Sequence, residues 1–80
     1  MTTTHEYRAY VFTLSYQPRD PVYTANFPDF PDIITSGETL AIAFAHACEA
    51  LDLHLESMDK LNLPAPQPLH RLVVQELMRQ

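Results

Sequence analysis

The sequence predicts an α+β domain, with a small sheet and one helix packed on one face of it, in the order strand, strand, strand, helix, strand. Aromatic and β-branched residues alternate near the N-terminus, as in a half-buried strand. Apolar residues recur at steps of three and four after residue 39, as in an amphipathic helix. The chain has 80 residues, so we expect a single domain, 1–80.

The first strand is predicted over residues 7–16, where no proline or glycine interrupts the chain. Its large residues share one parity and face the core; they are Tyr10, Phe12, Leu14 and Tyr16. Two prolines and an aspartate predict a turn over 17–21. Residues 22–27 are then the second strand, paired with the first in a hairpin.

Prolines separate the second strand from the third, because Pro28 and Pro31 cannot donate to a ladder. A short third strand is predicted over 33–35. The helix should start near Thr39, a competent N-cap, and end around Lys60. Its predicted buried stripe consists of Leu40, Phe44, Ala47, Leu51, Leu55 and Met58.

The last part of the chain divides into a tether and a strand. Residues 64–68 hold three prolines and are predicted to be extended. Residues 69–78 contain Leu72, Val73 and Val74 and are predicted to form the last strand, with a helical turn over 75–80 as the alternative for its end.

Composition excludes several classes of protein. The net charge of −5 argues against a phosphate-backbone binder. Gly37 is the one glycine, so a glycine-rich phosphate-binding loop is excluded. Cys48 is the one cysteine, so an intrachain disulfide is excluded. The start of the chain is polar, and the longest apolar runs are too short to cross a bilayer, so we expect a soluble, cytoplasmic protein with no membrane association.

The residues also give no pattern for catalysis, a cofactor or a metal site. Asp29 and Asp32 lie in a proline-bounded turn, where turn hydrogen bonds explain them better than a nuclease metal site does. His46 and Cys48 are two apart on a helix and point in nearly opposite directions, which is poor for sharing a metal ion. We therefore expect a protein that is not an enzyme and has no catalytic residues, cofactor or metal.

Acidic residues dominate the middle of the chain. Between Arg19 and Lys60 there are eight Asp or Glu residues and no Lys or Arg. Four of them step by three, four and three along the predicted helix, and so share one of its faces; they are Glu49, Asp52, Glu56 and Asp59. This face either docks a basic partner or is a solvated face that keeps a small protein soluble.

A second helix face is also rich in small and apolar residues, namely Ile42, Ala45, His46, Ala50 and Leu53. One sheet cannot cover two helix faces in a monomer. The pattern therefore indicates either a second contact, such as a homodimer, or a scatter of harmless exposed apolar residues.

Two motifs carry a family resemblance. Residues 23–31 read Tyr-Thr-Ala-Asn-Phe-Pro-Asp-Phe-Pro, and residues 34–40 read Ile-Thr-Ser-Gly-Glu-Thr-Leu and lead into an alanine-rich helix. With these motifs the chain resembles the HicB antitoxin family over about residues 7–77. It departs from the family pattern at Asp32, where glycine is usual, and at Ala41 and Ile42, where an acidic pair is usual.

The resemblance implies a partial ribonuclease-H-like sheet without catalytic acids, in an antitoxin that binds and masks a small, basic, HicA-type mRNA-cleaving toxin. The candidate contacts are Glu49, Asp52, Glu56 and Asp59. It also implies association as a dimer or tetramer. Many family members continue into a DNA-binding segment, and this chain ends at Gln80, so DNA binding is not expected from this chain alone. The alternative is a stand-alone oligomeric HicB-like scaffold or sensor module with no toxin partner.

Overall fold

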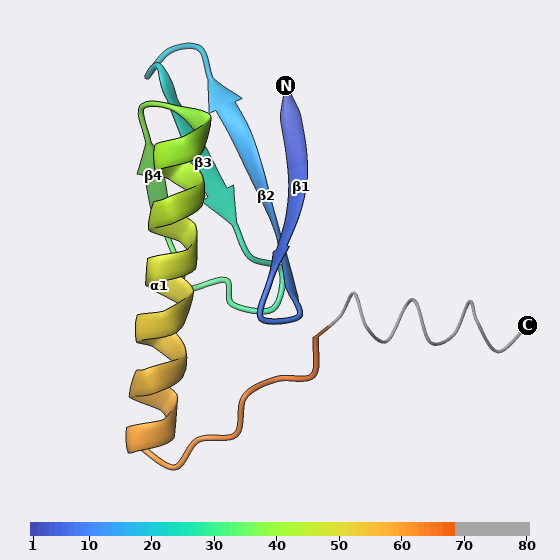
Figure 1. The fold of residues 1–80 in the computed structure, drawn as a ribbon, viewed down its shortest axis with the longest axis vertical. Coiled ribbons are helices and arrows are strands. Elements are labelled where there is room, and N and C mark those ends of the chain that lie inside the picture. Colours follow the sequence, from blue (N-terminus) through green and yellow to red (C-terminus); the bar gives the residue numbers. More distant parts are fainter. Residues whose placement is uncertain (69–80) are drawn as a thin grey trace, which may run out of the picture.

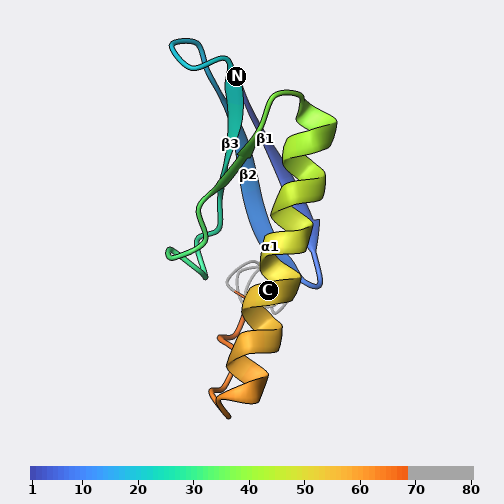
Figure 2. The same ribbon diagram turned by 90° about the vertical axis from the view of Figure 1, so that its left-hand side faces the viewer.

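A four-stranded antiparallel sheet lies against one long helix in the computed structural model, which describes residues 1–68 (Figure 1). The elements are β1 (Thr2–Tyr7), β2 (Tyr10–Gln17), β3 (Val22–Asn26), β4 (Thr35–Gly37) and α1 (Leu40–Lys60). The strands are ordered β1-β2-β3-β4, and α1 covers one face of the sheet (Figure 2). The predicted α+β class, with one helix on one sheet face, is confirmed.

The N-terminal hairpin corrects the first predicted strand. Residues 7–16 do not form one strand, because Tyr7 ends β1, Arg8 and Ala9 make the turn, and Tyr10 begins β2. β1 pairs with β2 throughout, from Thr2 opposite Ser15 to Tyr7 opposite Tyr10. The polar sequence of β1 gives no strand signal of its own, and the strand forms because it completes the ladder of β2.

The turn between β1 and β2 has an unusual backbone. Arg8 has a φ of 53° and Ala9 a φ of 71°, which is the left-handed region for two residues that carry a Cβ. Such a conformation costs about 1 kcal/mol or more per residue, and it persists only where the surroundings hold it.

The second hairpin is confirmed. β3 pairs with β2 from Gln17 opposite Val22 to Thr13 opposite Asn26, around the proline-containing turn. Tyr16 and Tyr23 face each other across the strands, with ring centroids 5.2 Å apart. The two aromatic rings stabilise the hairpin near its turn.

The third predicted strand lies two residues too early. Pairing occurs over Thr35–Gly37 instead of 33–35. Two successive turns between β3 and β4 explain the later start of pairing. In the first, the Phe30 amide donates to the Phe27 carbonyl at 3.1 Å, and in the second, the Ile33 amide donates to the Phe30 carbonyl at 3.0 Å. These turns carry Phe27, Phe30 and Ile33 into the core, so pairing resumes only at Thr35.

Both ends of α1 agree with the prediction. The Thr39 hydroxyl accepts a hydrogen bond from the Ile42 amide at 3.1 Å, as an N-cap does. At the other end Asn62 has a φ of 57°, and the Leu63 amide donates to the Met58 carbonyl at 2.9 Å. This is a Schellman motif, which ends the helix and turns the chain back.

The buried face of α1 differs in part from the predicted stripe. Its buried residues are Ala43, Ala47 and Leu51, whereas Leu40 and Phe44 are 36% and 37% exposed. The alanines face the sheet because α1 crosses β4 closely at Gly37, where a large side chain would not fit. Leu55 and Met58 pack against the margin of the core, as predicted.

Aromatic rings fill the core between the sheet and α1. Phe12, Phe27, Leu14 and Leu51 are its largest fully buried side chains. Phe12 lies against Phe27 with ring centroids 4.8 Å apart, and Tyr10 packs edge-on against Phe30 at the same separation.

After the helix the chain returns toward the sheet. The Tyr10 hydroxyl donates to the Pro66 carbonyl at 2.7 Å, which holds the proline-rich segment next to β2. The last predicted strand, 69–78, lies outside the described residues. Among the residues that are described, no helix has both the length and the apolar character needed to cross a bilayer.

Candidate protein-docking surface

A groove of about 640 Å³ lies between the C-terminal half of α1, the β1–β2 turn and the chain that follows the helix. We call it the acidic groove. Its lining residues are Arg8, Tyr10, Asp52, Leu55, Glu56, Met58, Asp59, Leu63 and Ala65.

The acidic groove combines carboxylates with apolar side chains. Asp52, Glu56 and Asp59 contribute three negative charges, and Arg8 contributes one positive charge. The apolar part comes from both walls, with Leu55 and Met58 on α1 and Leu63 on the returning chain. An open apolar surface with an acidic rim is suited to a basic protein surface that carries apolar residues.

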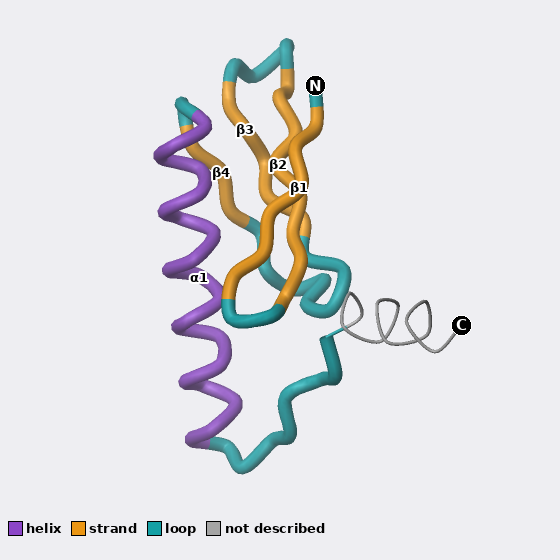
Figure 3. The backbone as a smooth tube through the Cα atoms, turned by 45° about the vertical axis from the view of Figure 1, so that its right-hand side comes forward, coloured by secondary structure: helices purple, strands orange, loops and turns teal. Residues whose placement is uncertain are grey.

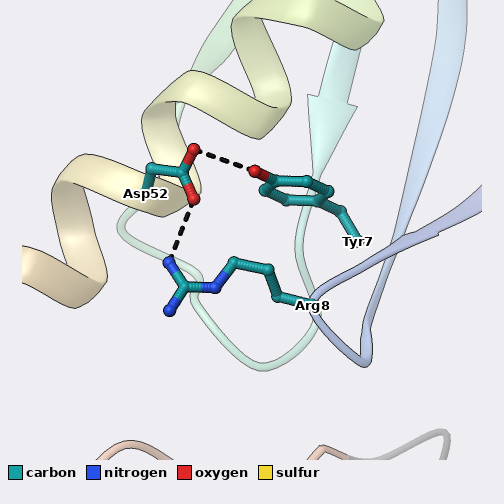
Figure 4. Close-up of polar contacts among 3 residues, drawn as sticks. All are labelled: Tyr7, Arg8 and Asp52. Atoms are coloured by element: carbon teal, nitrogen blue, oxygen red, sulfur yellow. Dashed lines mark hydrogen bonds and ion pairs between the residues drawn. The ribbon is translucent and has the colours of Figure 1, made fainter.

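Asp52 joins the helix to the β1–β2 turn (Figure 4). The Tyr7 hydroxyl donates to Asp52 Oδ2 at 3.0 Å, and Arg8 Nη1 donates to Asp52 Oδ1 at 3.0 Å. The ion pair is half exposed, at 50% for Arg8 and 46% for Asp52, so it contributes at most about 1 kcal/mol. Asp52 therefore has a structural role in positioning the turn as well as contributing charge.

These contacts affect the phenol of Tyr7. The hydrogen bond to the Asp52 carboxylate raises the pKa of Tyr7 above its ordinary value, and partial desolvation adds to the effect. The phenol, which is protonated at neutral pH even at its ordinary pKa, therefore stays protonated to a higher pH while it donates to Asp52.

Glu56 and Asp59 are the more accessible carboxylates of the acidic groove. Both are exposed, and Glu56 Oε1 accepts from Lys60 Nζ at 3.3 Å across one helical turn. Such an exposed pair is screened by salt and is easily exchanged for a contact with a partner.

Glu49 lies elsewhere. It lines a second hollow of about 290 Å³ together with Thr35, His46, Ala50 and Leu53. Ten residues separate Glu49 from Asp59, which is roughly 15 Å along the helix axis. Of the four predicted contact residues, the structure thus brings Asp52, Glu56 and Asp59 together and leaves Glu49 apart.

Tyr7 and Arg8 are site residues that the sequence did not indicate. Arg8 lies 44 residues before Asp52, and no local pattern connects the two. The sequence offers only a weak sign that Arg8 pairs with an acidic residue. Arg8 is one of five basic residues in an acidic chain, and it lies next to the predicted core strand.

Cys48 and His46, the pair two residues apart on α1, have separate surroundings. Burial, with the nearby Asp52 carboxylate, raises the pKa of the Cys48 thiol, so the reactive thiolate is scarcer at neutral pH than in an ordinary cysteine. The His46 Nδ1 donates to the Ser36 carbonyl at 2.7 Å. Within residues 1–68, no three His, Cys, Asp or Glu side chains gather closely enough to hold a metal ion.

The structure thus shows a small α+β domain with an acidic groove beside its helix. No family model matches the sequence, and no solved structure matches the chain. The chain is similar to an uncharacterized 14.9 kDa protein in the rep-hol intergenic region of Haemophilus phage HP1, with 34% identity over 55 residues. The match covers 66% of this chain and 41% of the phage protein, so it spans less than half the length of that relative.

Proposed function

We propose that this chain is a cytoplasmic, non-enzymatic HicB-like antitoxin domain that binds and neutralises a small HicA-type mRNA-cleaving toxin. One observation carries the proposal: Asp52, Glu56 and Asp59 line one groove together with the apolar Leu55, Met58 and Leu63. We place the docking surface there, and Glu49, which lines the other hollow, is left out of it.

Charge complementarity supports this use of the groove. A toxin that holds RNA needs a basic surface, because RNA is a polyanion. An acidic groove attracts such a surface at long range and raises the rate of productive encounter. The apolar side chains that line the groove supply contact area that excludes water, which charge by itself does not.

The motif that carries the family resemblance contributes to the core. Phe27 and Phe30 are buried at 0% and 3% exposure, so their side chains shape the turn after β3 and are unavailable to a partner. This supports a structural role for the Phe-Pro-Asp-Phe-Pro segment in the core. In the proposal, the acidic groove is the surface that binds the toxin.

Co-expression tests the proposed function. We expect the gene beside that of this chain to encode a small basic protein that arrests growth when expressed by itself. We expect this chain to relieve the arrest and to co-purify with that protein. The Phe12→Ala variant, whose core is disrupted, is the control and should not relieve the arrest. Growth arrest that persists in the presence of the folded chain, with no complex recovered, would contradict the antitoxin role.

A second candidate function is a stand-alone oligomeric HicB-like scaffold or sensor module with no toxin partner. Exposed apolar side chains favour it, since Ile34, Leu53 and Ile42 are 87%, 60% and 42% exposed. A stable oligomer of the purified chain, together with a neighbouring protein that is not toxic, would favour this second function over the first.

A further inference from the structure

The two edge strands of the sheet, β1 and β4, differ in how well they are protected. β4 is three residues long, and the Ser36 carbonyl accepts a hydrogen bond from His46 Nδ1 at 2.7 Å. Short edge strands and covered backbone groups both hinder pairing with another chain. β1 has six residues in continuous register with β2, and it contains no proline, glycine or lysine. Within residues 1–68, no further strand pairs with the outer side of β1.

The register shows which backbone groups of β1 point outward. In an antiparallel ladder, every second pair of residues exchanges hydrogen bonds, and the groups of the pairs between them point away from the neighbouring strand. The Tyr16 amide donates to the Met1 carbonyl at 3.1 Å, and counting by twos along the register assigns the odd-numbered residues of β1 to bonds with β2. The amides and carbonyls of Thr2 and Thr4 therefore point away from β2.

We propose that two copies of this chain pair antiparallel through β1, with Thr4 of one copy opposite Thr4 of the other. The two four-stranded sheets then join into one sheet. The two-fold axis is perpendicular to this sheet and passes between the two Thr4 residues. Thr2 lies opposite Glu6, and Thr3 lies opposite His5. Even-numbered residues thus meet even-numbered residues, so outward-pointing backbone groups face each other and paired side chains lie on the same face.

The side chains of β1 suit a second copy of the same strand. Thr2, Thr3 and Thr4 are consecutive β-branched residues, which favour extended backbone. The opposed Thr4 residues form a Thr–Thr pair, one of the cross-strand pairs that stabilise a sheet. In this register the two Glu6 side chains lie at opposite ends of the shared ladder, so the two like charges are kept apart.

The position of α1 leaves room for the second copy. α1 packs chiefly on β4 and β3, and Figure 3 shows it beside β4, on the side of the sheet away from β1. The axis keeps both helices on one face of the joined sheet, toward its two ends. Each end is then a β4 strand whose Ser36 carbonyl is bound by His46, so the assembly closes as a dimer.

The dimer does not depend on the proposed antitoxin role. None of the described residues that line the acidic groove belongs to β1. The two surfaces can therefore be tested separately, and loss of one leaves the other in place.

Symmetric disulfide trapping tests the pairing directly. Thr4→Cys, in a Cys48→Ala background, places two thiols opposite each other across the axis. The Cα atoms of such a pair are about 5.5 Å apart, a separation that a disulfide can span. We expect a covalent dimer after mild oxidation of the purified chain. Absence of this covalent dimer would overturn the proposal.

Two controls distinguish this register from random collision of exposed thiols. Thr13→Cys changes the threonine opposite Thr4 in β2, and two such residues would be about 14 Å apart in the dimer, three strand spacings away from each other. Thr2→Cys stays in β1, but its two copies would be about 13 Å apart along the ladder. Either control forming a covalent dimer as readily as Thr4→Cys would contradict the proposed register.

Proline at position 4 supplies an independent test. Because the Thr4 amide points away from β2, and proline is tolerated at such positions of an edge strand, Thr4→Pro should keep the fold, as circular dichroism would show. The dimer loses both hydrogen bonds of the Thr4 pair, so its dissociation constant should rise by about tenfold or more. Thr4→Val keeps the amide and should leave this constant nearly unchanged. Both are measured by sedimentation over a concentration series.

The sedimentation results decide between β1 pairing and other arrangements. Equal dissociation constants for Thr4→Pro and Thr4→Val would mean that β1 does not form the interface. A natural chain that stays monomeric up to about 1 mM would also overturn the proposal. Slow hydrogen exchange of the Thr4 amide in that monomer would show that another segment of the same chain covers β1. If Thr4→Pro does not fold, the cross-linking of Thr4→Cys decides by itself.

Discussion

Replacing Gly37 with alanine is expected to lower the free energy of unfolding by about 3 kcal/mol or more, enough to unfold most of a domain this small. Gly37 is buried in β4, where α1 crosses the strand. A Cβ at this position would lie 2.4 Å from the Ala43 amide nitrogen, 2.7 Å from the Ala43 Cα and 2.8 Å from the Ile42 carbonyl carbon. These are backbone atoms, which cannot rotate away, so the helix would have to move off the sheet.

Urea denaturation followed by circular dichroism measures this effect. Ser36→Ala is the matched control, because Ser36 is the exposed neighbour in the same strand and the carbonyl that accepts from His46 is kept. We expect the control to stay within about 0.5 kcal/mol of the natural chain. A Gly37→Ala variant as stable as this control would show that α1 does not approach β4 as described.

Truncating Phe12 to alanine is expected to cost about 3–5 kcal/mol. The ring is fully buried. It lies at the centre of the aromatic cluster, with centroids 4.8 Å from Phe27, 5.4 Å from His5 and 5.6 Å from Phe44. Its loss therefore loosens β1, the turn after β3 and α1 together.

Two further variants separate packing from strand propensity. Phe12→Leu keeps most of the apolar volume and should be clearly more stable than Phe12→Ala. Val11→Ala changes the neighbouring residue on the uncovered face of the sheet and should cost under about 1 kcal/mol. Equal losses for Phe12→Ala and Val11→Ala would mean that the aromatic cluster is not the centre of the core.

The parts of the fold that the sequence predicts well are those with strong local signals. The β2–β3 hairpin follows from alternation on both sides of a proline turn, and α1 follows from its N-cap and its apolar spacing. β1 carries no such signal, because Thr-Thr-Thr-His-Glu is polar on both faces. Its place depends on pairing with β2 and on a turn whose residues do not favour turns.

The candidate site shows the same division between local and tertiary information. Helical spacing places Glu49, Asp52, Glu56 and Asp59 on one face, since that requires only the period of the helix. Which of them share a groove depends on the β1–β2 turn and on the chain after the helix, and these elements are far away in sequence. The Arg8–Asp52 ion pair, 44 residues apart, is such a contact.

The central claim is that the acidic groove recognises a basic toxin, and the association rate constant tests it most directly. The rate would be measured by stopped flow with the purified toxin that the co-expression experiment identifies. The natural chain, Glu56→Lys/Asp59→Lys and Glu49→Lys would be compared over a salt series. We expect the double variant to associate about tenfold or more slowly at low salt, with the difference shrinking as salt screens the charges. Glu49→Lys should have a much smaller effect, because Glu49 lines the other hollow. Equal slowing by Glu49→Lys, or no slowing by the double variant at any salt concentration, would contradict the claim.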